Sequence, residues 1–178
     1  MPLMRNITVV DYNPQWPLEF SEEAGQIRSA LADVVVALHH IGSTSVPQLA
    51  AKPVIDMLLL VRDLDELDRC NRAMIDLGYQ PKGELGIAGR RFFSKGTDDQ
   101  RTHHVHAFEP GNSAASDHLA FRNYLRAKPQ LAQQYGRLKA KLAEEHSDDI
   151  EAYMVGKDPL IRELLQDARR LGVDNDRS

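Results

Sequence analysis

A turn of small polar residues and a single carboxylate stand close together in the first third of the chain. The turn is Gly42-Ser43-Thr44-Ser45, and Asp56 is the one acidic residue in the apolar run from Val54 to Val61. A glycine-serine turn at the N-terminus of a helix offers backbone N–H groups and hydroxyls to a phosphate. A carboxylate on the neighbouring strand can hold Mg²⁺. Together they predict a site for a phosphate and a metal ion, with Lys52 between them.

Three histidines, His103, His104 and His106, form a second candidate group. Side chains alternate between the two faces of a strand, so His104 and His106 point the same way and can both lie beside Asp56. One carboxylate with imidazoles favours a transition metal such as Mn²⁺ or Zn²⁺ over Mg²⁺ alone. The other interpretation is structural: the histidines contact solvent or hydrogen-bond in the core, and backbone amides satisfy the carboxylate.

Basic residues near these groups are candidates for phosphate binding. Arg91 follows a glycine-rich stretch, residues 83–89, and Lys157 lies in the last helical segment. An arginine can donate to two phosphate oxygens at once, whereas a lysine acts as a point charge. The alternative places these basic side chains in solvent. The predicted ligand site comprises Gly42, Ser43, Thr44, Ser45, Lys52, Arg91 and Lys157.

Strands and helices in alternation must position these residues. Hydrophobic periodicity predicts a β-type run at 7–12, a helix at 16–31, strands at 34–38 and 54–61, and a helix from Asp63 to Gly78. Strands at 91–94 and 102–108 then form a hairpin, and residues from Ser116 onward form helices separated at Pro129 and at 147–149. This order indicates an α+β domain that is α/β-like in character.

Composition limits the class of protein. The chain has 178 residues, 42% hydrophobic and 27% charged, which suits one domain over residues 1–172 followed by a polar tail at 173–178. A net charge of −4 gives no general attraction to DNA, and no stretch is apolar enough to span a membrane. With Cys70 as its one cysteine and no leader-like N-terminus, we expect a cytoplasmic protein. No heptad pattern indicates an oligomeric state.

The stretch from His40 to Asp56 resembles the signature of GrpB-like proteins, a branch of the nucleotidyltransferase superfamily. The similarity covers about residues 7–165 and implies a nucleotidyltransferase-type fold, a small mixed β-sheet flanked by helices. It also implies that the Gly-Ser turn and the acidic strand hold a nucleotide and that C-terminal helices cap the site. Further blocks of the family follow in order: Arg90–Phe93, Arg101–His106, Phe121–Leu125, and Tyr153 with Lys157.

One departure from the superfamily pattern leaves the activity open. The usual acidic strand carries a second carboxylate two residues after the first, so that both can grip metal ions, and here that position is Leu58. The resemblance implies a metal-dependent nucleotidyltransferase in which Asp56, with His104 or His106, binds the metal or transfers a proton. The alternative is a non-catalytic module that binds a nucleotide or phosphorylated metabolite, linked to coenzyme A metabolism through family members fused to dephospho-coenzyme A kinase. A purely structural domain is the third class.

Overall fold

A five-stranded mixed β-sheet forms the centre of the protein. The computed structural model describes residues 7–171, and its strands follow the order β1-β2-β5-β4-β3. β2 and β5 run parallel, while the other neighbouring pairs are antiparallel, which confirms the expected mixed sheet and the hairpin of β4 and β5. The strands are β1 Val35–Ile41, β2 Ile55–Val61, β3 Tyr79–Pro81, β4 Arg91–Gly96 and β5 Arg101–Phe108.

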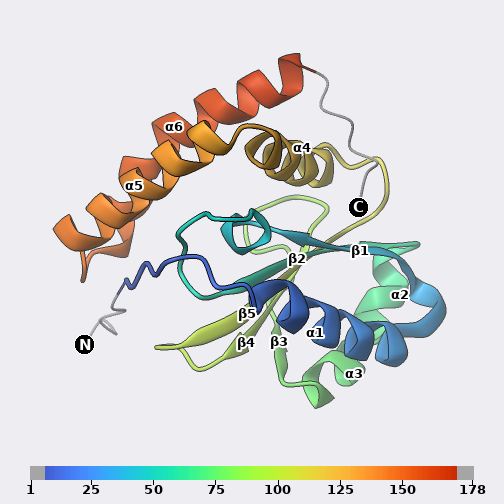
Figure 1. Ribbon diagram of the computed structural model, residues 1–178. Coiled ribbons are helices and arrows are strands. Elements are labelled where there is room, and N and C mark those ends of the chain that lie inside the picture. Colours follow the sequence, from blue (N-terminus) through green and yellow to red (C-terminus); the bar gives the residue numbers. More distant parts are fainter. Residues whose placement is uncertain (1–6, 172–178) are drawn as a thin grey trace.

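Helices cover both faces of the sheet (Figure 1). α1 and α3 lie against one face, and α4, α5 and α6 form a layer over the other. The part of the chain after β5 therefore builds a helical cover, as the resemblance implied. The helices are α1 Trp16–Leu31, α2 Leu64–Arg69, α3 Asn71–Asp76, α4 Ser113–Ala127, α5 Pro129–Glu145 and α6 Ile150–Arg170, with short 3-10 turns η1 Ala32–Val34 and η2 Ser43–Ser45.

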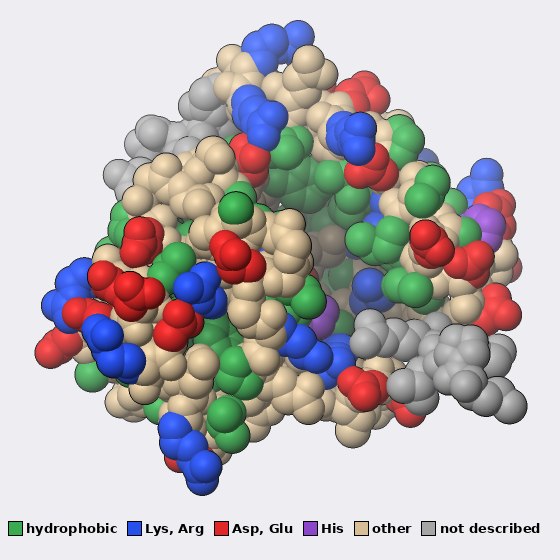
Figure 2. Space-filling view, turned by 180° about the vertical axis from the view of Figure 1, so that it is seen from behind, with side chains coloured by type: hydrophobic (Ala, Val, Ile, Leu, Met, Phe, Trp, Pro, Cys, Tyr) green, Lys and Arg blue, Asp and Glu red, His purple; other side chains and the backbone are tan. Residues whose placement is uncertain are grey.

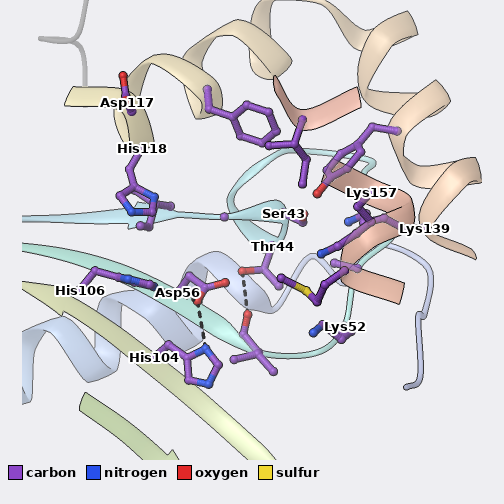
Figure 3. A pocket seen from close by; sticks show the side chains of 18 of the residues that line it. Ser43, Thr44, Lys52, Asp56, His104, His106, Asp117, His118, Lys139 and Lys157 are labelled. Atoms are coloured by element: carbon purple, nitrogen blue, oxygen red, sulfur yellow. Dashed lines mark hydrogen bonds and ion pairs between the residues drawn. The ribbon is translucent and has the colours of Figure 1, made fainter. Parts of the chain in front are cut away.

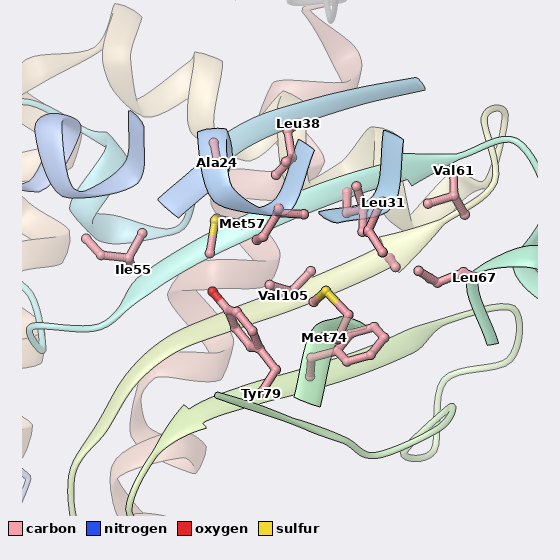
Figure 4. Close-up of a cluster of buried hydrophobic side chains, with 14 of the residues drawn as sticks. Ala24, Leu31, Leu38, Ile55, Met57, Val61, Leu67, Met74, Tyr79 and Val105 are labelled. Carbon is pink, nitrogen blue, oxygen red and sulfur yellow. The ribbon is translucent and has the colours of Figure 1, made fainter. Parts of the chain in front are cut away.

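Strand alternation divides the residues of β2 between two environments. Ile55, Met57 and Val61 are buried among side chains of α1 and α3 in one apolar cluster (Figure 4). Leu58 lies on the opposite face, where it packs against the α4 residues Ala115 and Leu119. Both faces of β2 are thus covered, which explains its almost continuous apolar sequence. Asp56 shares the face of Leu58, so its carboxylate lies on the side of the helical layer.

Several element boundaries differ from those expected. The run at 7–12 forms only an isolated bridge between Val10 and Ala51, because it lies beside a loop and not at an edge of the sheet. The helix expected from Asp63 to Gly78 is divided into α2 and α3, because Cys70 has φ −95° and ψ 8°, outside helical geometry. Helix boundaries at Pro129 and at 147–149 are confirmed. The predicted tail at 173–178 lies outside the described residues.

Candidate functional site

The turn after β1 depends on glycine at position 42. Gly42 has φ 72° and ψ −175°, a backbone conformation that is almost confined to glycine. A Cβ atom at this position would lie 2.6 Å from Oδ2 of Asp56, so the backbone approaches the carboxylate more closely than a side chain permits. The turn and Asp56 therefore meet directly, as their types and spacing suggested.

The turn leads into the short 3-10 turn η2, Ser43–Ser45, which side chains of its own residues hold in place. The Thr44 hydroxyl contacts Nε2 of His40 at 2.9 Å and donates to the Val54 carbonyl at 3.3 Å. The Ser45 hydroxyl donates to the Gly42 carbonyl at 2.5 Å. These bonds fix the turn against β1 and the start of β2. Ser43 and Thr44 both border the cavity described below, and the Thr44 hydroxyl is already engaged in these bonds.

Asp56 is held between two histidines of the neighbouring strand. The parallel register pairs Asp56 with His104 and Leu58 with His106. Oδ1 of Asp56 lies 3.3 Å from Nδ1 of His104 and 3.6 Å from Nε2 of His106 (Figure 3). Burial alone would raise the pKa of Asp56, but the hydrogen bonds from His104 and then His106 outweigh it and hold this pKa well below its usual range. The carboxylate is therefore ionised and ready to bind a cation.

The turn after β1, Asp56 and its two histidines line one cavity of about 600 Å³ between the sheet and the helical layer. Figure 2 shows a hollow on the back face of the molecule, bordered by hydrophobic, basic and histidine side chains. Phe92, Phe121, Ile161 and Leu165 give the cavity apolar walls. A pocket with mostly apolar walls and a few convergent polar groups is the usual form of a small-molecule site.

The structure brings together eight of the ten residues predicted for the site. The eight that line the cavity are Gly42, Ser43, Thr44, Lys52, Asp56, His104, His106 and Lys157. Ser45 is buried behind the turn and lies outside the lining. The functional roles of the eight lining residues stay predictions.

Arg91 lies on the wrong side of the sheet for this cavity. β4 and β5 are antiparallel and pair Arg91 with Ala107, so both side chains point toward the α1 and α3 face. The Arg91 guanidinium donates to both carboxylate oxygens of Asp68 in α2, at 2.8 and 3.0 Å. Its neighbour Phe92 points into the cavity instead. Because successive side chains of a strand point to opposite faces of the sheet, Arg91 faces α2 while Phe92, one residue later, faces the cavity.

The polar cavity residues that were not predicted for the site are Asp117, His118, Tyr135, Lys139 and Tyr153. A signal for Lys139 was present, because it follows Tyr135 by four residues and precedes Leu142 by three, on the apolar stripe of α5. A lysine on such a stripe must be buried, and the side chain of Lys139 is only 2% exposed. Tyr135 and Ser43 line the same cavity, so α5 faces the turn there.

The ligand set expected for a metal is incomplete in the described part of the chain. Within residues 7–171, no three histidine, cysteine or carboxylate side chains are arranged to hold one metal ion. Asp56 with its two imidazoles supplies suitable donor types, but Leu58 contributes none. Any metal at Asp56 would need further donors from a bound ligand. The same residues contain no helix that could cross a membrane.

Comparisons with known proteins show the family. A family model described as GrpB protein matches residues 6–167, and the chain belongs to the GrpB family. The UPF0157 protein YqkA of Bacillus subtilis is 46% identical over 166 residues, which are 93% of this chain and 48% of that protein. This chain thus spans about half the length of that relative. The dephospho-CoA kinase of Mycolicibacterium paratuberculosis is 23% identical over 187 residues, covering 91% of this chain and 46% of that protein.

Solved structures agree with the fold. The crystal structure of GrpB from Enterococcus faecalis has a TM-score of 0.88 and 42% identity, and covers 92% of this chain and 98% of that one. Terminal uridylyl transferase 4 from Trypanosoma brucei, with bound dUTP, has a TM-score of 0.59 and 12% identity, and covers 94% of this chain and 60% of that one. The fold is therefore that of nucleotidyltransferases, as the resemblance implied.

Proposed function

We propose that this protein binds a nucleoside triphosphate or another phosphorylated small molecule at the Gly42-Ser43 turn and Asp56, and that it acts as a metal-dependent nucleotidyltransferase. One observation carries the proposal: the turn, the ionised carboxylate and three lysines line the same cavity. A phosphate needs donors and positive charge, and a transferred nucleotidyl group needs a cation on its oxygens. The cavity brings both requirements to one place.

Each residue has a defined task in this proposal. The Ser43 hydroxyl and the backbone N–H groups of the turn donate to phosphate oxygens, and Lys52 and Lys157 neutralise phosphate charge. Asp56, His104 and His106 would supply part of the donor set for a divalent ion, Mg²⁺ or Mn²⁺ and also Zn²⁺ by donor type, and the bound ligand would supply the remaining donors. When bound, such an ion would polarise the reacting phosphate. His104 touches Asp56 and can also take a proton from an acceptor hydroxyl in the cavity.

A second candidate function is a non-catalytic nucleotide or phosphometabolite sensor. Leu58 favours it, because this side chain is fully buried under α4 and supplies no second carboxylate to grip a metal. The dephospho-CoA kinase relative favours a connection with coenzyme A metabolism, because nearly this whole chain matches under half of that protein. Both functions need the same phosphate site, so binding is the property to test first.

Isothermal calorimetry with ATP tests the site. We expect ATP to bind more tightly in the presence of Mg²⁺ or Mn²⁺ than in the presence of a chelator. Ser43→Ala and Asp56→Asn should each weaken ATP binding by roughly tenfold or more. Matched controls are Ser29→Ala on α1 and Asp76→Asn on α3, both exposed and far from the cavity lining. Equal affinity in all five proteins, or no binding of ATP or any other nucleoside triphosphate, would overturn the proposal.

Product analysis separates the two candidates. The enzyme would release pyrophosphate from a nucleoside triphosphate in the presence of a metal ion and an acceptor, which ³¹P NMR detects. Asp56→Asn should abolish the release, and Asp76→Asn should not change it. Metal-stimulated nucleotide binding without turnover, across a panel of hydroxyl-bearing acceptors, would instead support the sensor.

A further inference from the structure

Lys139 is a buried basic residue whose ammonium has no hydrogen-bond partner within residues 7–171. The residue is 2% exposed. The ammonium lies 4.7 Å from the centroid of the Tyr135 ring and is attracted by the charge of Asp56. Burying an ammonium without a hydrogen-bond acceptor is costly, and burial, with the charges of Lys157 and Lys52 nearby, lowers the pKa of Lys139 to about 7. Such an arrangement is unfavourable unless an anion completes it.

Two further polar groups lie on the same wall of the cavity. Nζ of Lys157 lies 4.6 Å from the ring centroid of Tyr153, and burial lowers the pKa of Lys157 to about 8. The Tyr153 hydroxyl is buried and, in the described part of the chain, also lacks a hydrogen-bond partner. Figure 3 shows Lys139 and Lys157 entering the cavity from the side of α5 and α6, across from Asp56. Unsatisfied donors thus gather on the helical wall.

We propose that Lys139, Lys157 and the Tyr153 hydroxyl form an anion subsite on the helical wall, which takes the terminal phosphate of a polyphosphate ligand. This inference rests on the proposed function, because it places a second part of the same ligand. The turn and Asp56 on the sheet wall suit one phosphate, and the lysines opposite suit another. A ligand with a phosphate chain satisfies both walls at once, whereas a monophosphate satisfies only one. The favoured class is therefore a nucleoside triphosphate over a nucleoside monophosphate.

Occupation of the subsite should change the protonation of Lys139. The titratable groups that face it are Lys157 on α6, Lys52 before β2, Asp56 on β2, and the hydroxyls of Tyr135 and Tyr153. A phosphate placed among them adds negative charge, which favours the charged amine. Binding at a pH somewhat above 7 should therefore take up protons from the buffer, and calorimetry in buffers of different ionisation enthalpy measures that uptake.

The test compares Lys139→Met with Lys141→Met, a matched variant on the solvent side of the same helix, where Lys141 is 70% exposed. The probes are ATP, AMP and inorganic tripolyphosphate, titrated with Mg²⁺ present. We expect Lys139→Met to weaken the binding of ATP and of tripolyphosphate by roughly 10- to 100-fold and to change the affinity for AMP by no more than about twofold. The uptake of protons on ATP binding should also be lost. Lys141→Met should behave as the wild type does.

The outcomes separate this inference from the proposed function. ATP binding that Lys139→Met leaves unchanged, or that it weakens no more than AMP binding, overturns the subsite and leaves the site at Ser43 and Asp56 standing. Loss of ATP and tripolyphosphate binding in Lys139→Met but not in Ser43→Ala supports the subsite and counts against the turn. No binding of any probe by the wild type overturns both. Thermal unfolding of each variant checks that it is folded. If Lys139→Met is unfolded, Lys157→Met replaces it, and we expect the same loss of ATP and tripolyphosphate binding with AMP binding kept.

Discussion

Gly42 is the residue at which the geometry of the turn is tested most directly. Alanine at this position would adopt a backbone conformation that is almost confined to glycine and would place Cβ 2.6 Å from the Asp56 carboxylate. We expect Gly42→Ala to lower the free energy of unfolding by about 2–4 kcal/mol, from backbone strain together with overpacking. Urea unfolding followed by circular dichroism measures this loss.

Gly25 provides the matched control for that substitution. It lies in α1 and is exposed, and a Cβ there would meet no atom within 4 Å. Gly25→Ala should raise the free energy of unfolding by about 0.5–1 kcal/mol, because alanine favours the helix. If Gly42→Ala and Gly25→Ala shift the urea midpoint in the same direction, the close approach of the turn to Asp56 is wrong.

At the scale of single residues, the sequence predicted those groups whose position follows from strand parity. Asp56 stands out in an apolar strand, and His104 and His106 occupy alternate positions on another, so a shared face was predictable. Their common contact at Oδ1 of Asp56 depends on the parallel register of β2 and β5, which no local pattern encodes. Arg91 was misplaced for the same reason: its parity relative to His106 is set by the pairing of β4 with β5.

At the scale of elements, Arg91 joins β4 to α2. Arg91 and Asp68 form a bidentate ion pair whose side chains are 20% and 40% exposed, so solvent weakens the pair. Arg91→Met should lower the free energy of unfolding by about 0.5–1 kcal/mol and leave ATP affinity unchanged. Chemical denaturation and calorimetry on the same preparation measure both quantities.

The partner residue offers a check on that interpretation. Asp68→Asn should lower the free energy of unfolding by a similar amount. The double variant should lower it by less than the sum of the two single losses, because both substitutions remove the same ion pair. A loss of ATP affinity in Arg91→Met as large as that in Ser43→Ala would show instead that Arg91 reaches the ligand.

The elements themselves could largely be predicted, but their breaks and their packing could not. Period-two and period-3.6 patterns located β2, the β4 and β5 hairpin, and the helices beginning at Pro129 and after Asp149. The break at Cys70 carries no glycine or proline, so no local pattern predicted it. The 3-10 turn after Gly42 is held by Thr44, which contacts His40 four residues before it and Val54 ten residues after it. These bonds depend on side-chain geometry that hydrophobic periodicity does not describe.

At the scale of the whole molecule, the cavity arises where the helical layer meets the sheet. Its walls come from β1, β2, β4 and β5 below and from α4, α5 and α6 above. The amphipathic stripes of those helices predicted that they pack, but not which buried polar residue faces which strand. This is why Lys139 and His118 escaped notice although both lie on helices that were expected.

The same layered packing makes the whole molecule sensitive to acid. Burial, and then the charges of nearby basic groups, lower the pKa values of His40 and His118 to about 4. In the unfolded chain these imidazoles bind protons near pH 6.5, so between about pH 6.5 and 4 the unfolded state binds more protons than the folded state. Protonation therefore favours unfolding, and stability should fall as the pH drops through this window, by on the order of 2 kcal/mol for each histidine.

Substitution of His118 isolates one contribution to that acid sensitivity. His118 lies beside His106 in the cavity wall, with ring centroids 4.9 Å apart and ring planes tilted by 46°. Glutamine at this position keeps a polar side chain that does not titrate. We expect His118→Gln to flatten the fall in the free energy of unfolding between pH 6.5 and 4.5 relative to the wild type, as measured by urea unfolding at a series of pH values. If the two proteins lose stability in parallel across this range, His118 is not held neutral by burial, and the acid sensitivity must come from other groups such as His40.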